Sequence, residues 1–384
     1  MFLPSLVLKN AFRHKLRTTL TVVGIVVAIT AFGLLRTIVD AWYAGANASS
    51  SARLVTRSSV SLVFALPLTY AQKLRQVPGV ASVTWANWFG GVYISERNFF
   101  PQFGIDAPTY LDMYPELVLS ADEKKAFLAD RKGAIVGRKL AEKYGWKVGD
   151  PIPLRGTIYT GTWTFTLRGI YDGGEATTDT STMYFHWDLL NEMVKRIYPR
   201  RADQTGVFIS LLRDPQQAAE VSQAIDATFR NSLAETLTET EKAFQLAFVA
   251  MAETILLAIQ AVSFVVIVII MAVMANTMAM TARERSAEYA TLKALGFGGG
   301  FVALLIFAES IAIALVGGVV GIGLTFPLAD AFAATVGSMF PSILVSTETI
   351  ALQLCAALLV GVVAAALPAW RAARIRIVDG LRAI

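Results

Sequence analysis

Four long apolar runs constrain the fold of this chain more than any other feature. Residues 18–35, 254–282 and 349–370 contain no Asp, Glu, Lys or Arg, and residues 301–327 contain only Glu309. A membrane-spanning helix needs about 20 consecutive, mostly apolar residues. The composition agrees, because 55% of the residues are hydrophobic and 16% are charged, whereas soluble domains carry about 25% charged residues. We therefore expect four transmembrane helices.

The first apolar run follows a basic leader, as the apolar segment of a secretory signal peptide does. A signal peptide, however, has a short apolar segment with a small-x-small cleavage site close behind it. This run is long, and AGANASSSA at residues 44–52 is only a weak candidate for cleavage. We therefore expect the first run to remain in the mature protein as a transmembrane helix.

Lys and Arg gather at one end of each apolar run. They are Lys9, Arg13, Lys15 and Arg17 in the leader, Arg283, Arg285 and Lys293 after the second run, and Arg371, Arg374, Arg376 and Arg382 in the tail. Because cytoplasmic segments carry the excess of basic residues, we expect both termini and residues 283–300 in the cytoplasm. Residues 40–242 then lie outside. This bias accounts for most of the net charge of +5, so we expect no nucleic-acid partner.

The order of segments follows from these assignments. The leader places Leu8, Phe12 and Leu16 on one stripe beside basic residues, which is typical of an amphipathic helix on a membrane surface. We expect that cytoplasmic helix at residues 1–17, the first span and the start of a stalk at 18–40, an outer domain at 41–234, a stalk helix at 235–253, the second span at 254–282, a polar cytoplasmic helix at 283–297, the third span at 301–327, a short external loop at 328–348, the fourth span at 349–370 and a cytoplasmic tail at 371–384.

The segment between the first two runs is long enough for one or two hydrophobic cores. Helix-like and strand-like stretches alternate in it, which predicts a large extracytoplasmic α/β domain inserted into a membrane α-helical fold. We expect a hairpin at residues 81–94, a strand pair at 161–174 and continuous helix at 235–253. The one cysteine, Cys355, lies in the fourth run, so this domain folds without an intrachain disulfide.

Nucleotide hydrolysis would require a glycine-rich loop between a strand and a helix, and no G-x-x-x-x-G-K-[ST] motif occurs. GFGGGF at residues 296–301 follows a helical stretch and lacks the last glycine of a dinucleotide fingerprint. We interpret it as the end of a helix followed by a loop. We therefore expect that this chain does not hydrolyse nucleotides by itself.

Catalytic and metal sites have few candidate residues. The two histidines, His14 and His186, stand far apart, and Asp172, Glu175 and Asp179 share a Gly/Thr-rich stretch. These acids lack the regular ligand spacing of a calcium loop, so a solvated turn is favoured over a weak cation site. We expect no catalytic residue and no metal site.

Glu309 is the one acid inside an apolar run. An ionisable residue within a membrane is a functional candidate by default. Because this residue lies about two helical turns from the cytoplasmic end, a functional role and structural pairing remain equal alternatives. Gly317, Gly318 and Gly321 follow it, and Gly317 and Gly321 have the small-xxx-small spacing that lets another helix approach closely. We expect these glycines to contact a second transmembrane helix.

The stretch TARERSAEYATLKALGF, residues 281–297, is charged and helix-forming, yet it lies between two apolar runs. Glu284 and Glu288 stand four residues apart and repel each other in an isolated helix. Tyr289, Leu292 and Leu295 give the same helix an apolar edge, from which a solvated loop would gain nothing. We therefore favour a docking element whose acids meet basic residues of a cytoplasmic partner and whose apolar edge fills a groove on it.

Several stretches, taken in order, resemble FtsX-like and MacB-type ABC transporter permeases. RERSAEYATLKALGF is similar to the coupling helix of that family, and LKNAFRHKLRTTLTVVGIVVAI to its N-terminal elbow and first span. GAIVGRKLAEKYGWKVGDPIPL and FTLRGIYDGG resemble its periplasmic core domain, ESIAIALVGGVVGIGL its third span, and LPAWRAARIRIVDGLRAI its C-terminal signature. The resemblance covers nearly the whole chain.

The resemblance implies a dimeric permease of the type VII class, which works by mechanotransmission. ATP-driven closure of a separate ATPase dimer would be relayed through the first two spans and the stalk to the outer domain. The second permease would be an identical copy or a paralogue, and the ATPase would bind ATP and Mg²⁺. The residues that dock the ATPase would be Arg283, Glu284, Arg285, Glu288, Tyr289, Leu292 and Lys293.

Two functions of different class agree with the resemblance. One is export or extraction of an amphipathic substrate, such as an antibiotic, peptide, siderophore, lipid or lipoprotein, with a periplasmic adaptor and an outer-membrane channel as further partners. The alternative is an FtsX-like signalling relay that regulates a cell-envelope hydrolase and moves no solute. The large outer domain favours export, although a fold rarely decides a function by itself.

Overall fold

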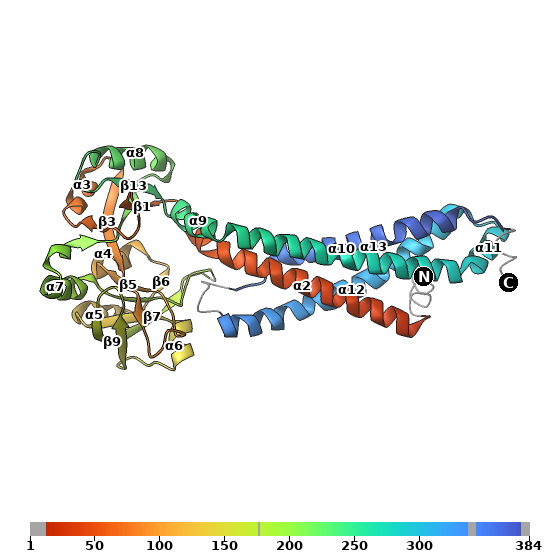
Figure 1. The fold of residues 1–384 in the computed structure, drawn as a ribbon, viewed down its shortest axis with the longest axis horizontal. Coiled ribbons are helices and arrows are strands. Elements are labelled where there is room, and N and C mark those ends of the chain that lie inside the picture. The colour runs from red at the N-terminus through yellow and green to blue at the C-terminus, as the bar shows by residue number, and fades with distance from the viewer. Residues whose placement is uncertain (1–12, 176, 337–342, 378–384) are drawn as a thin grey trace. The chain divides into compact units, whose positions relative to one another are not determined.

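The computed structural model describes residues 13–175, 177–336 and 343–377. Contacts within the chain divide it into two compact units (Figure 1). The membrane unit consists of Met1–Asp40, Glu253–Thr335 and Ile343–Ile384, and the outer unit consists of Ala41–Ala252 with Val336–Ser342. Most of the amphipathic helix predicted at residues 1–17 lies outside the described residues.

Four helices in the described part of the chain are long and apolar enough to cross a membrane. They are α2 (Lys15–Ala48), α10 (Glu253–Glu284), α12 (Gly299–Val336) and α13 (Thr347–Ala373). Each apolar run of the sequence lies within one of these helices, which confirms the predicted number of transmembrane helices. A short helix, α11 (Ser286–Ala294), connects α10 to α12.

Small residues bring α12 close to two neighbouring helices. A Cβ atom at Gly317 would lie 2.7 Å from Ile25 of α2, and one at Gly321 would lie 3.0 Å from the same helix. A Cβ atom at Gly318 would lie 2.7 Å from Ala357 of α13. Larger side chains at these positions would push the helices apart, because membrane helices associate through close van der Waals contact.

Buried hydrogen bonds join the same helices within the apolar layer. Gln353 of α13 is fully buried, and its amide nitrogen donates to the backbone oxygen of Ile29 at 2.9 Å and to the hydroxyl of Thr325 at 2.8 Å. The hydroxyl of Ser310 in α12 donates to the backbone oxygen of Gly361 in α13 at 2.6 Å. Because little water competes inside a membrane, such bonds help to fix the register of the helices.

The outer unit is built on an 11-stranded sheet with the order β13-β1-β12-β3-β5-β10-β7-β9-β8-β4, and β6 pairs with β9 off this path. Its strands are β1 (Arg53–Ser58), β3 (Val80–Trp88), β4 (Gly91–Val92), β5 (Gln102–Ile105), β6 (Leu117–Val118), β7 (Gly133–Gly137), β8 (Pro151–Gly156), β9 (Gly161–Gly173), β10 (Met183–His186), β12 (Val207–Leu212) and β13 (Thr236–Thr240). A second sheet pairs β2 (Leu66–Pro67) with β11 (Gln204–Thr205). Two neighbouring pairs, β5 with β10 and β7 with β9, are parallel.

Helices pack on this sheet and complete its hydrophobic cores. They are α3 (Tyr70–Gln76), α4 (Ala107–Met113), α5 (Ala121–Ala129), α6 (Arg138–Tyr144), α7 (Trp187–Ile197), α8 (Ala218–Thr228) and α9 (Glu241–Met251). One core gathers Phe89, Phe165 and Phe185, and another gathers Leu74 of α3 and Phe208 of β12, all of them fully buried. The α/β class predicted for the domain between the first two spans is confirmed.

Three local predictions for the outer unit are wrong. Residues 81–94 do not form a hairpin, because β3 pairs with β12 and β5, whereas β4 pairs with β8. Residues 161–173 form one long strand, β9, between β7 and β8. Residues 236–240 form β13 against β1, and helix begins only at Glu241, the start of α9. In each case pairing with strands outside the segment outweighs the local pattern.

Candidate functional site

The helix α11 lies between two local breaks in the chain. The preceding helix α10 ends at Glu284, and Arg285 leaves helical geometry with φ −100° and ψ 12°. After α11, Gly296 has φ +94°, and a Cβ atom there would meet nothing within 4 Å. Glycine adopts this positive φ without steric cost, which makes it a common residue just past the end of a helix. The sequence therefore places the end of this helix correctly.

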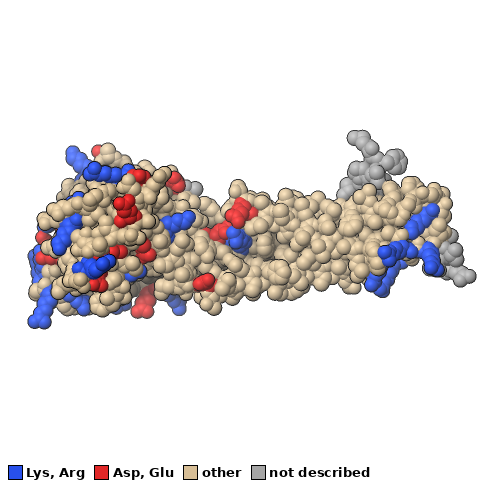
Figure 2. All heavy atoms as spheres, turned by 90° about the horizontal axis from the view of Figure 1, so that it is seen from above, with Lys and Arg blue, Asp and Glu red and all other residues tan. Residues whose placement is uncertain are grey.

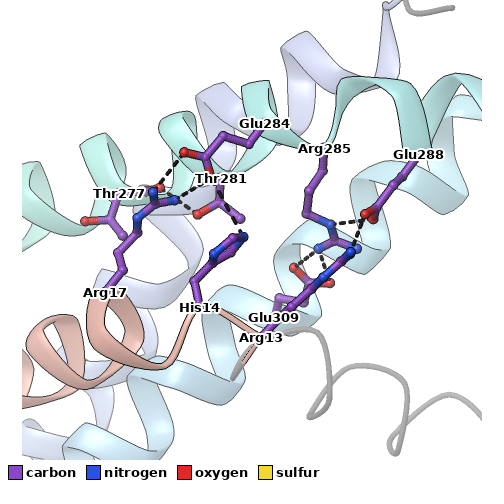
Figure 3. Close-up of polar contacts among 9 residues, drawn as sticks. All are labelled: Arg13, His14, Arg17, Thr277, Thr281, Glu284, Arg285, Glu288 and Glu309. Atoms are coloured by element: carbon purple, nitrogen blue, oxygen red, sulfur yellow. Dashed lines mark hydrogen bonds and ion pairs between the residues drawn. The ribbon is translucent and has the colours of Figure 1, made fainter. Parts of the chain in front are cut away.

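Arg285 is the centre of the site (Figure 3). Its Nη1 donates to both carboxylate oxygens of Glu309 at 2.8 Å, and its Nε donates to Glu288 at 2.9 Å. The side chains of Arg285 and Glu309 are 7% and 3% exposed. Burial alone would lower the pKa of Arg285, but its hydrogen bonds to acidic partners and their negative charge raise that pKa above its usual value. The guanidinium therefore stays charged, and the structural pairing considered for Glu309 is present.

This buried pair joins the start of α11 to α12. Relative to an apolar pair of similar size, a buried ion pair adds little net stability. The loss of one partner, however, leaves a buried charge and costs about 3–5 kcal/mol. We therefore infer that the pair of Arg285 and Glu309 mainly fixes the position of α11 against α12. A position that separated the two residues would leave each charge buried without its partner.

The two acids that repel each other in the sequence both contact cations of this chain (Figure 3). Glu284 accepts hydrogen bonds from Nη1 and Nη2 of Arg17 at 2.7 and 2.8 Å, and Glu288 accepts from Arg13 as well as from Arg285. Burial raises the pKa of Glu288, but the bonds from Arg285 and Arg13 outweigh it and hold that pKa below its usual value. The repulsion is thus relieved within the chain, without a partner's cations.

Three other residues predicted for docking face the chain's own helices. Tyr289 is 1% exposed in the core of the membrane unit, and burial raises the pKa of its phenol to about 12. Leu292 is half-buried against the same core. The ammonium of Lys293 donates to the backbone oxygens of Ala373 and Ile375 at 2.6 and 2.9 Å, at the end of α13. The burial of Tyr289 contradicts the hypothesis that its ring fills a groove on a partner.

The exposed side chains near the C-terminal end of α11 are mostly apolar. Leu295 is 72% exposed and Phe297 is 44% exposed, and the rings of Phe297 and Phe301 stack with centroids 4.7 Å apart. Thr291, on α11 itself, is also exposed. We call Thr291, Leu295 and Phe297 the docking surface. The sequence pattern includes Leu295 in the apolar edge but not Phe297, because a helical projection shows which residues share a face, and not which of them the rest of the chain covers.

The polar candidates of the outer unit take part in its own structure. Asp172 accepts two hydrogen bonds from Arg138, each of 2.8 Å, and Asp179 accepts from the backbone and hydroxyl of Ser181. Nε2 of the buried His186 lies 2.8 Å from a backbone oxygen. Within the described residues, no group of three His, Cys, Asp or Glu side chains is arranged to hold a metal ion.

Two family models match the chain. The model of the FtsX-like permease C-terminal matches residues 261–377, which contain α11, Arg285 and Glu309. The model of the MacB-like periplasmic core domain matches residues 18–228, more than half of the chain. This chain belongs to the MacB/FtsX-like ABC permeases. Members of the family are membrane permeases that work with a cytoplasmic ABC ATPase, and this MacB/FtsX-like permease is a multi-pass membrane protein.

Three solved structures are similar to this MacB/FtsX-like permease. The extracellular domain of the ABC-type transporter YknZ from Gram-positive bacteria is 14% identical, with a TM-score of 0.36 over 49% of this chain and 100% of that chain. The periplasmic region of MacB from Actinobacillus actinomycetemcomitans is 10% identical, with a TM-score of 0.35 over 51% and 92%. A domain of a permease protein from Porphyromonas gingivalis is 16% identical, with a TM-score of 0.33 over 49% and 88%. No curated protein sequence matches the chain.

Proposed function

We propose that this permease relays movement from an ATPase subunit, bound at the docking surface, to its outer unit, and so drives export or extraction of an amphipathic substrate. The ATPase subunit binds ATP and Mg²⁺, and the membrane dimer contains two copies of this chain or this chain and a paralogue. An adaptor and an outer-membrane channel would complete an export route. The observation that carries the proposal is the buried pair of Arg285 and Glu309, which ties α11 to α12.

The orientation in this proposal places both termini and α11 in the cytoplasm and the membrane unit in a bacterial inner membrane. Figure 2 shows a surface without charges along the helices and basic side chains gathered at their end near α11. Basic residues of this kind are concentrated on the cytoplasmic side of membrane proteins. The side that carries α11 is therefore the side from which a cytoplasmic ATPase approaches.

A force on α11 reaches several spanning helices through contacts of the membrane unit. The chain continues from α10 into α11, and Arg285 ties α11 to α12. Glu284 contacts Arg17 of α2, and Glu288 contacts Arg13, which precedes α2. Coupling between distant sites travels through rigid elements of this kind when they have two arrangements. We propose that ATP-driven closure of the ATPase moves α11 and, with it, α2, α10 and α12.

The outer unit has a matching contact at the helix that precedes α10. Arg53 of β1 is 6% exposed at its side chain and pairs with Glu241, the first residue of α9, at 2.7 Å. Arg53 also pairs with Glu116 at 2.6 Å. A buried contact at the first turn of α9 lets a displacement of that helix act on β1, the strand beside the edge strand β13. This contact supports a mechanical role for the outer unit.

The test of the proposal uses the exposed docking surface and the cognate ATPase. The double replacement of Leu295→Asp and Phe297→Asp should abolish co-purification of the ATPase and stimulation of its ATP hydrolysis, because each lost apolar anchor costs about 2 kcal/mol. Leu233→Asp is the matched control, since Leu233 is 98% exposed in the outer unit. Unchanged co-purification of the ATPase and unchanged stimulation of its ATP hydrolysis in the double variant would contradict docking at this surface.

A transport assay with the permease and its ATPase distinguishes export from regulation. In inside-out vesicles, the export proposal predicts ATP-dependent movement of a fluorescent amphipathic substrate that is lost in the docking-surface double variant. ATP-dependent activation of an added envelope hydrolase, with no movement of substrate by the unmodified permease, would instead support the regulatory relay.

A further inference from the structure

A groove at the membrane boundary lies between the ends of α10 and α13. Its volume is about 340 Å³, and its apolar lining includes Ala279 of α10 and Leu367 and Pro368 of α13. This volume falls within the range of about 300–1,000 Å³ that is usual for small-molecule pockets. The groove is therefore large enough for a small headgroup with the first part of an acyl chain, and most of its lining suits the apolar part of such a ligand.

Two arginines stand at the polar rim of the groove. Arg283 directly follows the second apolar run, and Arg371 directly follows the fourth, so both lie where the membrane meets water. Both residues are exposed, and the described lining contains no Asp or Glu. Among the residues that the structure describes, neither guanidinium has an acidic partner within ion-pair distance. The nearest acid in sequence, Glu284, is bound by Arg17.

Aromatic and basic neighbours mark the same boundary. Trp370, one residue before Arg371, is 53% exposed, and the guanidinium of Arg374 lies 4.4 Å from its ring centroid. Tryptophan is enriched at the level of lipid headgroups, where one side of its ring is apolar and the other is wet. Basic pockets between spanning helices at this level bind the headgroups of anionic lipids.

We propose that this groove binds one anionic phospholipid, with its phosphate between Arg283 and Arg371 and an acyl chain along Ala279, Leu367 and Pro368. The positive rim selects the anionic headgroup, and the apolar floor selects a lipid over a free phosphate. Because the groove is formed by α10 and α13 together, a bound lipid holds the two helix ends at one spacing. The site does not depend on the proposed docking of an ATPase.

The binding test uses the full chain purified in detergent and a phosphatidylglycerol with a fluorescent tail. Displacement by unlabelled phosphatidylglycerol should be stronger than by phosphatidylcholine. The double replacement of Arg283→Gln and Arg371→Gln should remove this preference, with about a fivefold loss of phosphatidylglycerol affinity for each arginine. Arg376→Gln is the matched control, because Arg376 is exposed at the same end of the chain but does not line the groove.

A second variant tests the apolar floor without changing charge. Ala279→Phe should fill the groove and weaken binding of both lipids, while the arginines at the rim remain. If the arginine variant proves unstable, this replacement still decides the matter, because unchanged lipid affinity in Ala279→Phe would overturn the proposal. So would an equal loss of affinity in Arg376→Gln, which would show only a general attraction to basic residues.

Two further outcomes would assign the groove to another occupant. Displacement of the labelled lipid by inorganic phosphate at the same concentration as by phosphatidylglycerol would show a free-phosphate site and overturn the lipid proposal. A disulfide between two copies carrying Ala279→Cys, in a Cys355→Ser background, would show that a second chain covers the groove. The proposal predicts neither result.

Discussion

Two buried arginines, one in each unit, hold a short helix, yet their surroundings differ. In the outer unit, Arg53 donates to Glu241 at 2.7 Å, to Glu116 at 2.6 Å and to the backbone oxygen of Met113 at 3.1 Å. In the membrane unit, Arg285 directs its three bonds to carboxylates of α11 and α12. Arg53 thus binds three segments of the outer unit, whereas Arg285 binds carboxylates of two helices, α11 and α12.

The comparison shows a difference in how readily a lost partner is replaced. Glu241 also accepts hydrogen bonds from the backbone of Ser50 at 3.0 Å and from the hydroxyl of Tyr114 at 2.9 Å, so it stays partly satisfied without Arg53. Glu309 lies in a membrane-spanning helix, where water does not readily replace a lost partner. We therefore infer that the outer unit tolerates damage at its arginine better than the membrane unit does.

The largest expected effect is at Arg285. Arg285→Ala should lower the free energy of unfolding by about 3–5 kcal/mol, because it leaves the carboxylate of Glu309 buried without its cation. Denaturant unfolding of the full chain in detergent measures this change. The combined replacement of Arg285→Met and Glu309→Leu should recover most of the loss, since no buried charge remains. A larger loss in the combined variant than in Arg285→Ala would contradict this account of the pair.

A smaller effect is expected at Arg53. Arg53→Ala should lower the free energy of unfolding by about 2–3 kcal/mol, because Glu241 and Glu116 lose their shared cation while Glu241 keeps two other donors. The same unfolding measurement applies, and Arg196→Ala, at an exposed position, is the control. If Arg53→Ala lowers the free energy of unfolding more than Arg285→Ala does, the proposed difference between the two units is wrong.

The exposed pair of Arg17 and Glu284 should contribute least among the ion pairs. Their side chains are 27% and 37% exposed, and exposed pairs contribute only about 0.2–1 kcal/mol. Arg17→Ala should therefore change the free energy of unfolding by less than about 1 kcal/mol, and the change should shrink further as salt screens the charges. A salt-independent loss of several kcal/mol would place this pair in the same class as Arg285 and Glu309.

The pH dependence at Glu288 should be the smallest effect. Because the folded pKa of Glu288 is held below its unfolded value, its contribution to stability is present above the unfolded pKa of about 4.3 and is lost as pH falls through the folded pKa. Glu288→Gln should flatten the acid side of the stability profile by less than about 1 kcal/mol, since the side chain is partly exposed and screened. The profile of unfolding midpoint against pH measures this, and an unchanged profile would show that the leader arginine and Arg285 do not bind this carboxylate.

The sequence predicts the spans and α11 well because their signals are local. A run with at most one charged residue marks each span, and the positive φ at Gly296 suits the glycine that the sequence places there. The strand pairing of the outer unit is predicted poorly, because the partner of a strand is decided by packing over the whole sheet. The glycine pair at residues 90–91 suits the turn of a hairpin, but the strands on its two sides, β3 and β4, do not pair with each other.

The partners within the candidate site are also non-local. The sequence singles out Arg285 and Glu309 for separate reasons, and nothing in it joins residues that stand 24 positions apart. Arg13 and Arg17 serve in the sequence analysis only to orient the spans. The same orientation, however, puts the basic residues before the first span and the acids after the second on one side of the membrane. That opposition of charge is the signal from which the contacts of Glu284 and Glu288 could have been inferred.

The central claim is that the pair of Arg285 and Glu309 transmits movement of α11 to the membrane-spanning helices. It is tested most directly by an ATP-dependent distance between two spin labels, one at Asp122→Cys of this chain and one in the outer unit of the second permease of the proposed dimer, in a Cys355→Ser background. The account predicts that the combined Arg285→Met and Glu309→Leu variant still binds the ATPase and supports hydrolysis, while the ATP-dependent change in distance is lost. A full change in distance in that variant would contradict the account.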